Sequence, residues 1–213
     1  MELNYEMFYY LSFKKQYFFS YQSLSYIKPI RKVKKMKLKK GDKFTKLTLP
    51  NTRGQNFDIV SAQGKKTLVT FYRFAQCPFC NLRVNEFVRR YGELENKLNV
   101  VAIFDSPLNH LIESTKKHDA PFEILADESF KYFREYEVEQ SAWKFFLGSI
   151  IRFYKFIPAT LKGYIPLSFK GSLTTVPVDI LLNENSVIEN VYYGRNTTDH
   201  MSFEAILEFV NKK

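Results

Sequence analysis

Both cysteines of the 213-residue chain lie in one short motif, Cys77-Pro78-Phe79-Cys80. The motif follows a run of β-branched and aromatic residues and precedes a segment with helical spacing. A cysteine at the start of a helix meets unpaired N–H groups and the positive end of the helix dipole, which stabilise a thiolate. Pro78 suits the first helical turn, and the two sulfurs are one turn apart, within reach of a reversible disulfide. The motif therefore predicts a thiol-redox site.

Two other interpretations of the motif compete with redox chemistry. A zinc site needs two more ligands, and only His110, His118 and His200 are available, none in ligand spacing with the cysteines. Two inert buried thiols also fit the pattern. We favour the redox interpretation and expect neither a metal nor a cofactor. Because the chain has no third cysteine, any intramolecular disulfide must join Cys77 to Cys80.

Strand and helix patterns alternate along the chain on either side of the motif. Near-continuous apolar runs at 67–73 and 99–104 are typical of strands buried on both faces, and residues 81–98 have helical spacing. The other patterns predict strands near 47–49, 57–59, 122–125, 178–182 and 187–193, and helices at 107–118, 128–136 and 202–210, the last with Ser202 as its N-cap. This order predicts an α/β fold with a mixed central sheet and helices on both faces.

A second chemical signal is Thr175-Val176-Pro177, directly before a predicted strand. Together with the cysteine motif it completes a set of short segments that follow one another in the order of a known family. The chain resembles the peroxiredoxin-like (AhpC/TSA, redoxin) branch of the thioredoxin superfamily over about residues 43–135 and 174–211. The segments that carry the resemblance are Leu49-Pro50 with Gly54, Phe71-Tyr72-Arg73, the cysteine motif, Val176-Pro177-Val178-Asp179 and Tyr193-Gly194-Arg195.

The resemblance implies a thioredoxin-like three-layer fold with Cys77 and Cys80 at the active site. It also implies that Pro177 lies beside them as a cis-proline that opens a strand. Arg73 and Arg195 are candidates to stabilise a thiolate or a developing oxyanion, although ordinary loop or surface arginines fit the sequence too. His200, preceded by Asp199, is a candidate proton shuttle, with a loop histidine near a helix cap as the simpler interpretation.

The choice of nucleophile stays open at the level of sequence. Typical members of the family carry the motif Pro-x-x-x-Thr/Ser-x-x-Cys. If Cys80 takes the peroxidatic position, Cys77 stands where Thr or Ser is expected and Arg73 stands where Pro is expected. The alignment thus favours Cys80, whereas helix-dipole and exposure arguments favour Cys77.

The expected function is that of a cytoplasmic, antioxidant oxidoreductase. It would reduce hydroperoxides or disulfides through Cys77 and Cys80 and be reset by an external thiol donor such as a thioredoxin-type protein. The alternative from another class is a non-catalytic thioredoxin-fold module that binds a partner or a membrane surface. A homodimer is compatible with either function.

The net charge of +10 is concentrated in the first forty residues. These residues hold ten Lys or Arg and only two acids, Glu2 and Glu6, so they carry +8 of the total. The remaining chain lacks the basic footprint that nucleic-acid binding requires. We therefore expect residues 1–40 to be a basic aromatic extension, disordered or preceding a natural start at Met36, and residues 41–213 to form the folded domain.

An insertion at residues 138–173 interrupts the strand and helix order. Between Gln140 and Val178 the chain has five basic residues and no acid, and aromatic residues are interleaved with them. The simplest expectation is an insertion that packs on the edge of the domain. A lid over the active site, a dimer interface and a basic amphipathic membrane contact are the other interpretations, and the membrane contact is not favoured.

Overall fold

The computed structural model describes residues 36–94, 96–151, 156–164 and 170–212. Most of the expected N-terminal extension lies outside these residues. The expected boundary after residue 40 falls within a packed segment, because Leu38 is buried and its backbone N–H donates to the Tyr193 hydroxyl at 3.0 Å. The described part of the folded unit therefore begins at Met36, five residues before the expected start.

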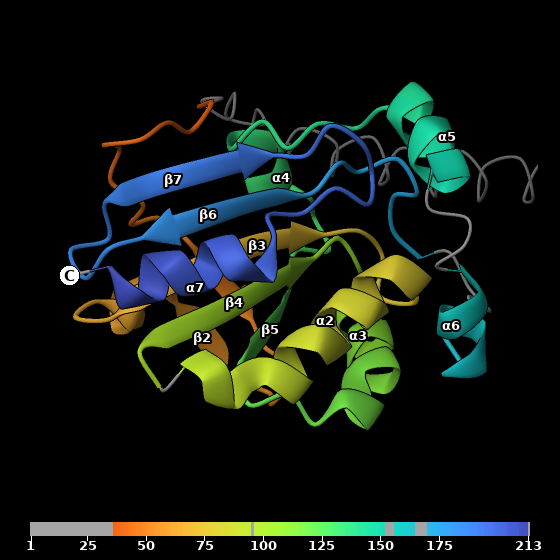
Figure 1. The fold of residues 1–213 in the computed structure, drawn as a ribbon, viewed down its shortest axis with the longest axis horizontal. Helices are drawn as coiled ribbons and strands as arrows, with labels where there is room; N and C mark the ends of the chain where they lie inside the picture. Colours follow the sequence, from red (N-terminus) through yellow and green to blue (C-terminus); the bar gives the residue numbers. More distant parts are fainter. Residues whose placement is uncertain (1–35, 95, 152–155, 165–169, 213) are drawn as a thin grey trace, which may run out of the picture. The chain divides into compact units, whose positions relative to one another are not determined.

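A five-stranded mixed sheet in the order β5-β4-β3-β6-β7 forms the centre of the fold (Figure 1). Strands β3 (Lys66–Tyr72), β4 (Leu98–Phe104) and β5 (Glu123–Ala126) are parallel, while β6 (Val178–Leu182) and β7 (Ile188–Tyr193) form an antiparallel hairpin beside β3. A separate small hairpin joins β1 (Thr48–Pro50) to β2 (Asn56–Asp58). Strands β3 and β4 are buried over nearly their whole length, which explains why their sequences are mainly apolar.

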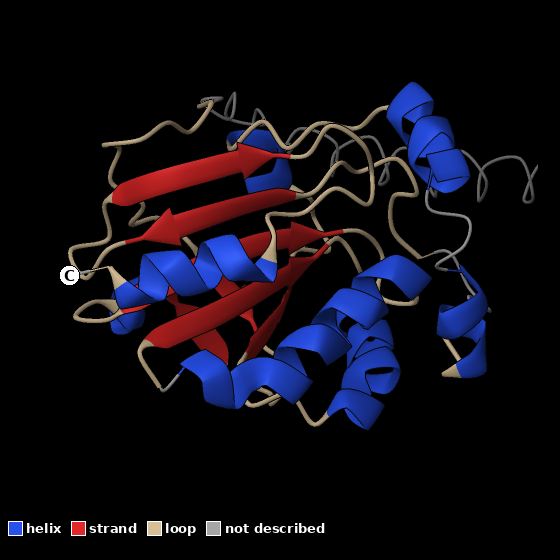
Figure 2. Ribbon diagram, in the orientation of Figure 1, coloured by secondary structure: helices blue, strands red, loops and turns tan. Residues whose placement is uncertain are grey.

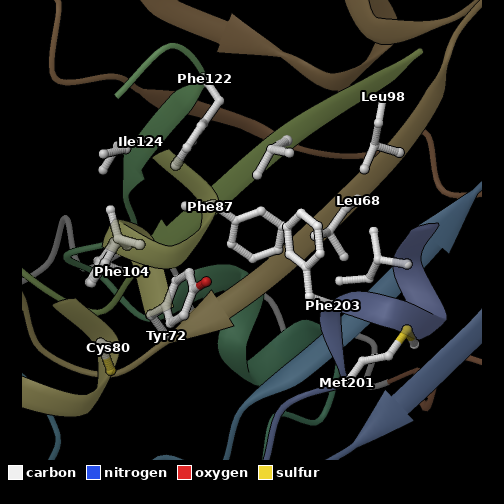
Figure 3. Packing of buried hydrophobic residues seen from close by; sticks show 14 of the residues in the cluster. Leu68, Tyr72, Cys80, Phe87, Leu98, Phe104, Phe122, Ile124, Met201 and Phe203 are labelled. Atoms are coloured by element: carbon white, nitrogen blue, oxygen red, sulfur yellow. The ribbon is translucent and has the colours of Figure 1, made fainter. Parts of the chain in front are cut away.

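Helices cover both faces of the sheet, as the alternating order predicts (Figure 2). Helices α2 (Pro78–Arg90), α3 (Leu108–Thr115) and α7 (Phe203–Asn211) contribute to one hydrophobic cluster. In this cluster the ring centroids of Phe87 and Phe203 are 5.4 Å apart (Figure 3). Helix α4 (Lys131–Glu135) and the segment around β1 pack on the opposite face. Ser202 caps α7 as expected, accepting from the Ala205 N–H. The predicted α/β fold, with a mixed central sheet and helices on both faces, is confirmed.

Two of the predicted details differ from the structure. The helix expected over 81–98 begins at Pro78 and ends at Arg90, followed by a 3-10 turn over Tyr91–Leu94. The expected cis-proline is wrong, because no cis peptide bond occurs among the described residues and Pro177 follows a trans bond. The trans form is the ordinary preference of a residue before proline. Here the flanking backbone is satisfied in that form, since Val176 N–H donates to the Glu139 carbonyl and the Pro177 carbonyl accepts from Gly194 N–H.

The insertion leaves and rejoins the sheet domain at one place. Gln140 pairs with Thr175, and Ser141 N–H donates to the Thr174 carbonyl at 2.9 Å. Between these ends, α5 (Ala142–Ile151) and α6 (Phe156–Leu161) lie beyond the carboxyl ends of β3 and β4 (Figure 1). Several apolar side chains of the two helices are exposed, namely Trp143, Phe146, Ile150, Ile157 and Leu161. In the described residues we find no helix with the length and apolarity needed to span a membrane.

Candidate functional site

Cys77 is the N-cap of α2, at the end of the short loop that follows β3. Its sulfur accepts the N–H of Cys80 at 3.4 Å, as a serine or aspartate oxygen does at an ordinary cap. Both cysteines are reduced and buried, with Cys77 at 0% and Cys80 at 3% exposure. The sequence prediction that a helix N-terminus presents the first thiol is therefore matched by the geometry, but neither thiol lies at the surface.

Arg73, the first residue after β3, is the cation of the site. Its Nη2 lies 3.0 Å from the Cys77 sulfur, and its Nη1 donates to the Leu173 carbonyl at 3.1 Å. The guanidinium also lies within 6 Å of the rings of Phe79 and Phe145. Its Nε is buried and has no hydrogen-bond partner among the described residues. The motif and the insertion thus hold Arg73 from two sides.

This arrangement separates the pKa values of the two thiols. Burial alone would raise the pKa of Cys77, but the hydrogen bond from the Cys80 thiol, the charge of Arg73 and nearby backbone N–H groups lower it to about 6. Burial raises the pKa of Cys80, and the neighbouring Cys77 thiolate raises it further. Cys77 is therefore mainly a thiolate at pH 7, while Cys80 keeps its proton and donates it in a hydrogen bond.

Asn81 fixes the turn that carries the two cysteines. Its amide donates to the carbonyls of Ala75 and Cys77 at 2.8 and 2.9 Å, and its Oδ1 lies 2.6 Å from Nε2 of His118. Because Asn81 Oδ1 can only accept, Nε2 of His118 carries the hydrogen. Burial lowers the pKa of His118 to about 4, so the ring is neutral at pH 7. In the described part of the chain no group of three or more potential metal ligands occurs.

A groove of about 590 Å³ reaches the second thiol from the side of α6. Cys80 and His200 both line it, together with Arg83, Lys162 and apolar residues of α2 and the α7 start. His200 pairs through Nδ1 with Asp179 at 3.1 Å, not with its sequence neighbour Asp199. The candidate proton shuttle therefore faces the Cys80 side of the site and is oriented by a buried carboxylate.

The structure does not bring Arg195 to the thiols. Its side chain is 85% exposed, and its Nε donates to Asp199 at 3.1 Å. Pro177 lies immediately before β6, which pairs with β3. Of the residues predicted to support the cysteines, Arg73 thus contacts Cys77 and Pro78 is the first residue of α2, whereas Arg195 forms a surface ion pair.

Sequence reasoning missed several residues that shape the site. Asp105 follows β4 directly and is buried among residues 171–175, and Asn81 and Phe145 hold the cysteine turn and Arg73. The only signal for Asp105 is its place at the end of a buried strand, because carboxyl ends of parallel strands meet at one edge of a sheet. Phe145 has no such signal, since only the folded insertion brings it to Arg73.

Comparison with known proteins gives a consistent family. The profile of the AhpC/TSA family matches residues 40–190. A putative peroxiredoxin of Mycobacterium tuberculosis is 30% identical over 95 residues, which cover 44% of this chain and 60% of that protein. Peroxiredoxin Bcp of Escherichia coli is 25% identical over 166 residues, covering 76% of this chain and 90% of that protein.

Solved structures share the fold at lower identity. A thiol peroxidase from Chromobacterium violaceum matches with a TM-score of 0.59 and 17% identity, covering 84% of this chain and 89% of that chain. Peroxidoxin BcpB from Mycobacterium tuberculosis matches with a TM-score of 0.57 and 14% identity, covering 81% of this chain and 94% of that chain. At such identities the likeness concerns the fold alone.

Proposed function

The chain belongs to the AhpC/TSA family, and from that premise we propose that it is a thiol peroxidase with Cys77 as the nucleophile and Cys80 as the resolving thiol. The observation that carries this proposal is the contact of 3.0 Å between Arg73 Nη2 and the Cys77 sulfur. A buried guanidinium beside a thiol favours the thiolate, which is the form that attacks. The pKa of Cys80, one helical turn away, is raised instead, so Cys80 keeps the proton that the resolving step needs.

The proposed reaction has two chemical steps and a reset. The Cys77 thiolate attacks the terminal oxygen of a hydroperoxide, which leaves Cys77 as a sulfenic acid and releases an alkoxide. The Cys80 thiol then condenses with the sulfenic acid, forming the Cys77–Cys80 disulfide and water. An external dithiol of the thioredoxin type restores the two thiols by exchange.

Arg73 supports the first step in a way that the usual family motif does not. When the family motif is aligned with Cys80 at its peroxidatic position, Cys77 stands where Thr or Ser is usual, so the hydroxyl that would bind the peroxide is absent. The Nε–H of Arg73, which has no partner in the described part of the chain, is a donor available to a peroxide oxygen. Developing negative charge on that oxygen would be stabilised by the same guanidinium.

Access to Cys77 requires the insertion to move. Cys77 and Arg73 are 0% and 3% exposed, and Phe145 and the Leu173 carbonyl of the insertion contact the Arg73 guanidinium that lies against Cys77. We therefore assign α5 and residues 170–174 to a cover over the thiolate. In this proposal the insertion is a lid over the active site, which is one of the interpretations that its sequence allows.

The test follows free thiols after reduced protein is mixed with hydrogen peroxide or an alkyl hydroperoxide. We expect the wild-type protein to lose two thiols per chain faster than free cysteine does. Cys80→Ser should lose one thiol at the same rate, and Cys77→Ser should react only as an ordinary thiol. Fast loss that persists in Cys77→Ser would make Cys80 the nucleophile. Wild-type loss no faster than free cysteine would exclude a peroxidase.

Thiol–disulfide exchange is the second candidate function. It is favoured by the lowered pKa of the N-cap cysteine and by the pairing of both thiols within one turn. The same three proteins, mixed with a small aromatic disulfide at pH 7, would distinguish the two functions. Rapid exchange at Cys77 with slow peroxide reduction would favour the exchange function. Slow reaction with both substrates would favour the non-catalytic binding module.

A further inference from the structure

Disulfide formation creates a charge problem at this site. Arg73 is 3% exposed, and the group that balances its charge is the Cys77 thiolate at 3.0 Å. When Cys77 joins Cys80, that negative charge disappears, and a buried cation without a partner is strongly unfavourable. A second group that can become negative within the same buried cluster would remove this cost.

Asp105 is placed to be that group. It follows β4, the neighbour of β3 in the sheet, and is 1% exposed. Its Oδ2 accepts from the Thr175 hydroxyl at 2.8 Å, and its Oδ1 accepts from Ser172 N–H at 3.3 Å. Leu173, which lies between these two donors in the sequence, supplies the carbonyl that binds the Arg73 guanidinium. One short segment therefore holds both the cation and the carboxyl group.

The packing around Asp105 excludes water on the side of the insertion. Gly171 has a φ of 134°, a conformation suited to glycine, and a Cβ there would lie 2.4 Å from Asp105 Oδ1. Ser106, the next residue, donates to the Lys170 carbonyl at 2.8 Å and accepts from Ala75 N–H at 2.7 Å. The carboxyl group is thus enclosed by the backbone of residues 170–175.

The charges that surround Asp105 favour its neutral form while Cys77 is a thiolate. The pKa of Asp105 is raised to about 8, mainly by burial and in smaller part by the Cys77 thiolate, while the hydrogen bonds from Thr175 and Ser172 and the charge of Arg73 oppose the rise. Other titratable groups at this end of the sheet include Cys80 on α2, Lys170 on the covering segment and His110 on α3, whose pKa is lowered by burial and by Lys170. Asp127, which directly follows β5, is also buried, and its carboxyl group accepts from the backbone N–H groups of Lys131 and Tyr132.

We propose that Asp105 stores the proton of the redox cycle, protonated beside the Cys77 thiolate and ionised beside the Cys77–Cys80 disulfide. The peroxide half of this cycle rests on the proposed function, while the disulfide half needs only the two cysteines. The buried cluster then holds one cation and one anion in both redox states.

Atoms and charges balance in each step of the proposed cycle. The Cys77 thiolate attacks the hydroperoxide and breaks its O–O bond, giving the sulfenic acid and an alkoxide that takes the proton of Asp105 to become an alcohol. The sulfenic acid and the Cys80 thiol form the disulfide and release water. An external dithiol reduces the disulfide by two electrons and supplies two protons, one to Cys80 and one to Asp105, and leaves Cys77 as a thiolate.

The test counts protons by equilibrating the full-length protein with dithiothreitol between pH 6.5 and 7.5. Reduction of the wild-type protein should take up two protons per disulfide, and oxidation of dithiothreitol releases two. The equilibrium constant for reduction of the protein by dithiothreitol should therefore hardly change with pH. Reduction of Asp105→Asn should take up only one proton. Because one proton is then released overall, the same equilibrium constant should rise about tenfold per pH unit for this variant. Asp58→Asn, which changes an exposed carboxyl group, is the matched control and should behave as wild type.

Two results would overturn the inference. One is an equilibrium constant for reduction that does not depend on pH in Asp105→Asn. The other is an equilibrium constant that rises about tenfold per pH unit in the wild-type protein. Because no peroxide is used, a slow peroxidase does not affect this count, and failure to form any Cys77–Cys80 disulfide would instead overturn the proposed function together with the inference.

A second measurement covers the case in which Asp105→Asn does not fold. The infrared difference spectrum of wild-type protein at pH 7 should lose a protonated-carboxyl band when the disulfide forms. A spectrum in which no carboxyl band changes on oxidation would overturn the proposal. This readout needs no substitution at Asp105.

Discussion

Two aspartates, Asp105 and Asp179, are buried to almost the same extent in this protein and have opposite ionisation behaviour. Asp105 is 1% exposed and Asp179 is 2% exposed. The pKa of Asp105 is raised to about 8, whereas the pKa of Asp179 is lowered, although burial opposes the charge of both. Burial alone therefore does not decide whether a carboxyl group keeps its proton.

The neighbours of each carboxyl group account for the difference. Asp179 accepts from the Thr70 hydroxyl at 2.5 Å and from Met201 N–H at 2.7 Å, and its neighbour His200 lowers its pKa. Asp105 accepts from one hydroxyl and one more distant N–H, with the Cys77 thiolate nearby. Asp179 is thus a fixed anion that joins β3, β6 and the start of α7, while Asp105 can exchange its proton.

The largest effect is expected from removing the fixed anion. Asp179→Asn should lower the free energy of unfolding by about 3 kcal/mol at pH 7, because it takes one partner from a buried charged cluster. Since the folded-state pKa of Asp179 is lowered, its stabilisation is present above the ordinary aspartate value and is lost as pH falls through the folded value. Urea unfolding at pH 7 and at acid pH measures the difference, which should shrink at acid pH.

The thiol titration provides the control for this variant. Asp179→Asn should leave the pH midpoint of Cys77 alkylation unchanged, because the pKa of Cys77 is set by its own burial, by Cys80 and by Arg73. The carboxylate of Asp179 instead accepts from Thr70 and Met201. An equal loss of stability at all pH values, or a moved midpoint, would contradict the view that Asp179 is an anchor separate from the thiol site.

A smaller effect, confined to the thiol, is expected at Arg73. Arg73→Met keeps much of the side-chain volume but removes the charge beside Cys77, so the pKa of Cys77 should rise by about two pH units. Thiolate absorbance as a function of pH measures this shift. Arg195→Met, at the exposed arginine paired with Asp199, is the matched control and should leave the titration unchanged. A similar shift in both variants would show that Arg195 acts on the site after all.

These comparisons also show what sequence could and could not predict. The cysteine motif, the strand before it and the helix after it follow from local patterns, so the expected places of Cys77, Cys80 and Pro78 in the chain's elements agree with the structure. The two arginines had equal standing in the sequence, but only the one that directly follows β3 reaches the thiol. Asp105 could not be assigned a role, because its burial and its partners come from residues 171–175, which are distant in sequence.

The partner of His200 was missed for the same reason. The sequence places Asp199 next to it, but the folded chain instead pairs His200 with Asp179 on β6. The cis-proline was wrong because it was carried over from the family, and no pattern in the neighbouring residues predicts which isomer forms. Local patterns thus predicted the elements, whereas contacts between distant segments determine which side chains meet.

The smallest effect is expected from two hydroxyl groups, and it tests the contrast between the aspartates most directly. Thr70→Val and Thr175→Val each remove one donor, to Asp179 and to Asp105 respectively. A hydrogen bond to a charged acceptor contributes about 2 kcal/mol, and one to a neutral acceptor about 1 kcal/mol. At pH 7 in the reduced protein, Thr70→Val should therefore destabilise about twice as much as Thr175→Val, as measured by urea unfolding.

Oxidation should remove this difference. Once the disulfide has formed, Asp105 is ionised in our proposal, so the Thr175 hydroxyl then donates to a carboxylate and its loss should cost as much as the loss of the Thr70 hydroxyl. The Thr70→Val effect should be the same in both redox states, because Asp179 is an anion in each. Equal costs for the two variants in the reduced protein, or a Thr175→Val cost that oxidation leaves unchanged, would mean that the two buried aspartates do not differ in charge.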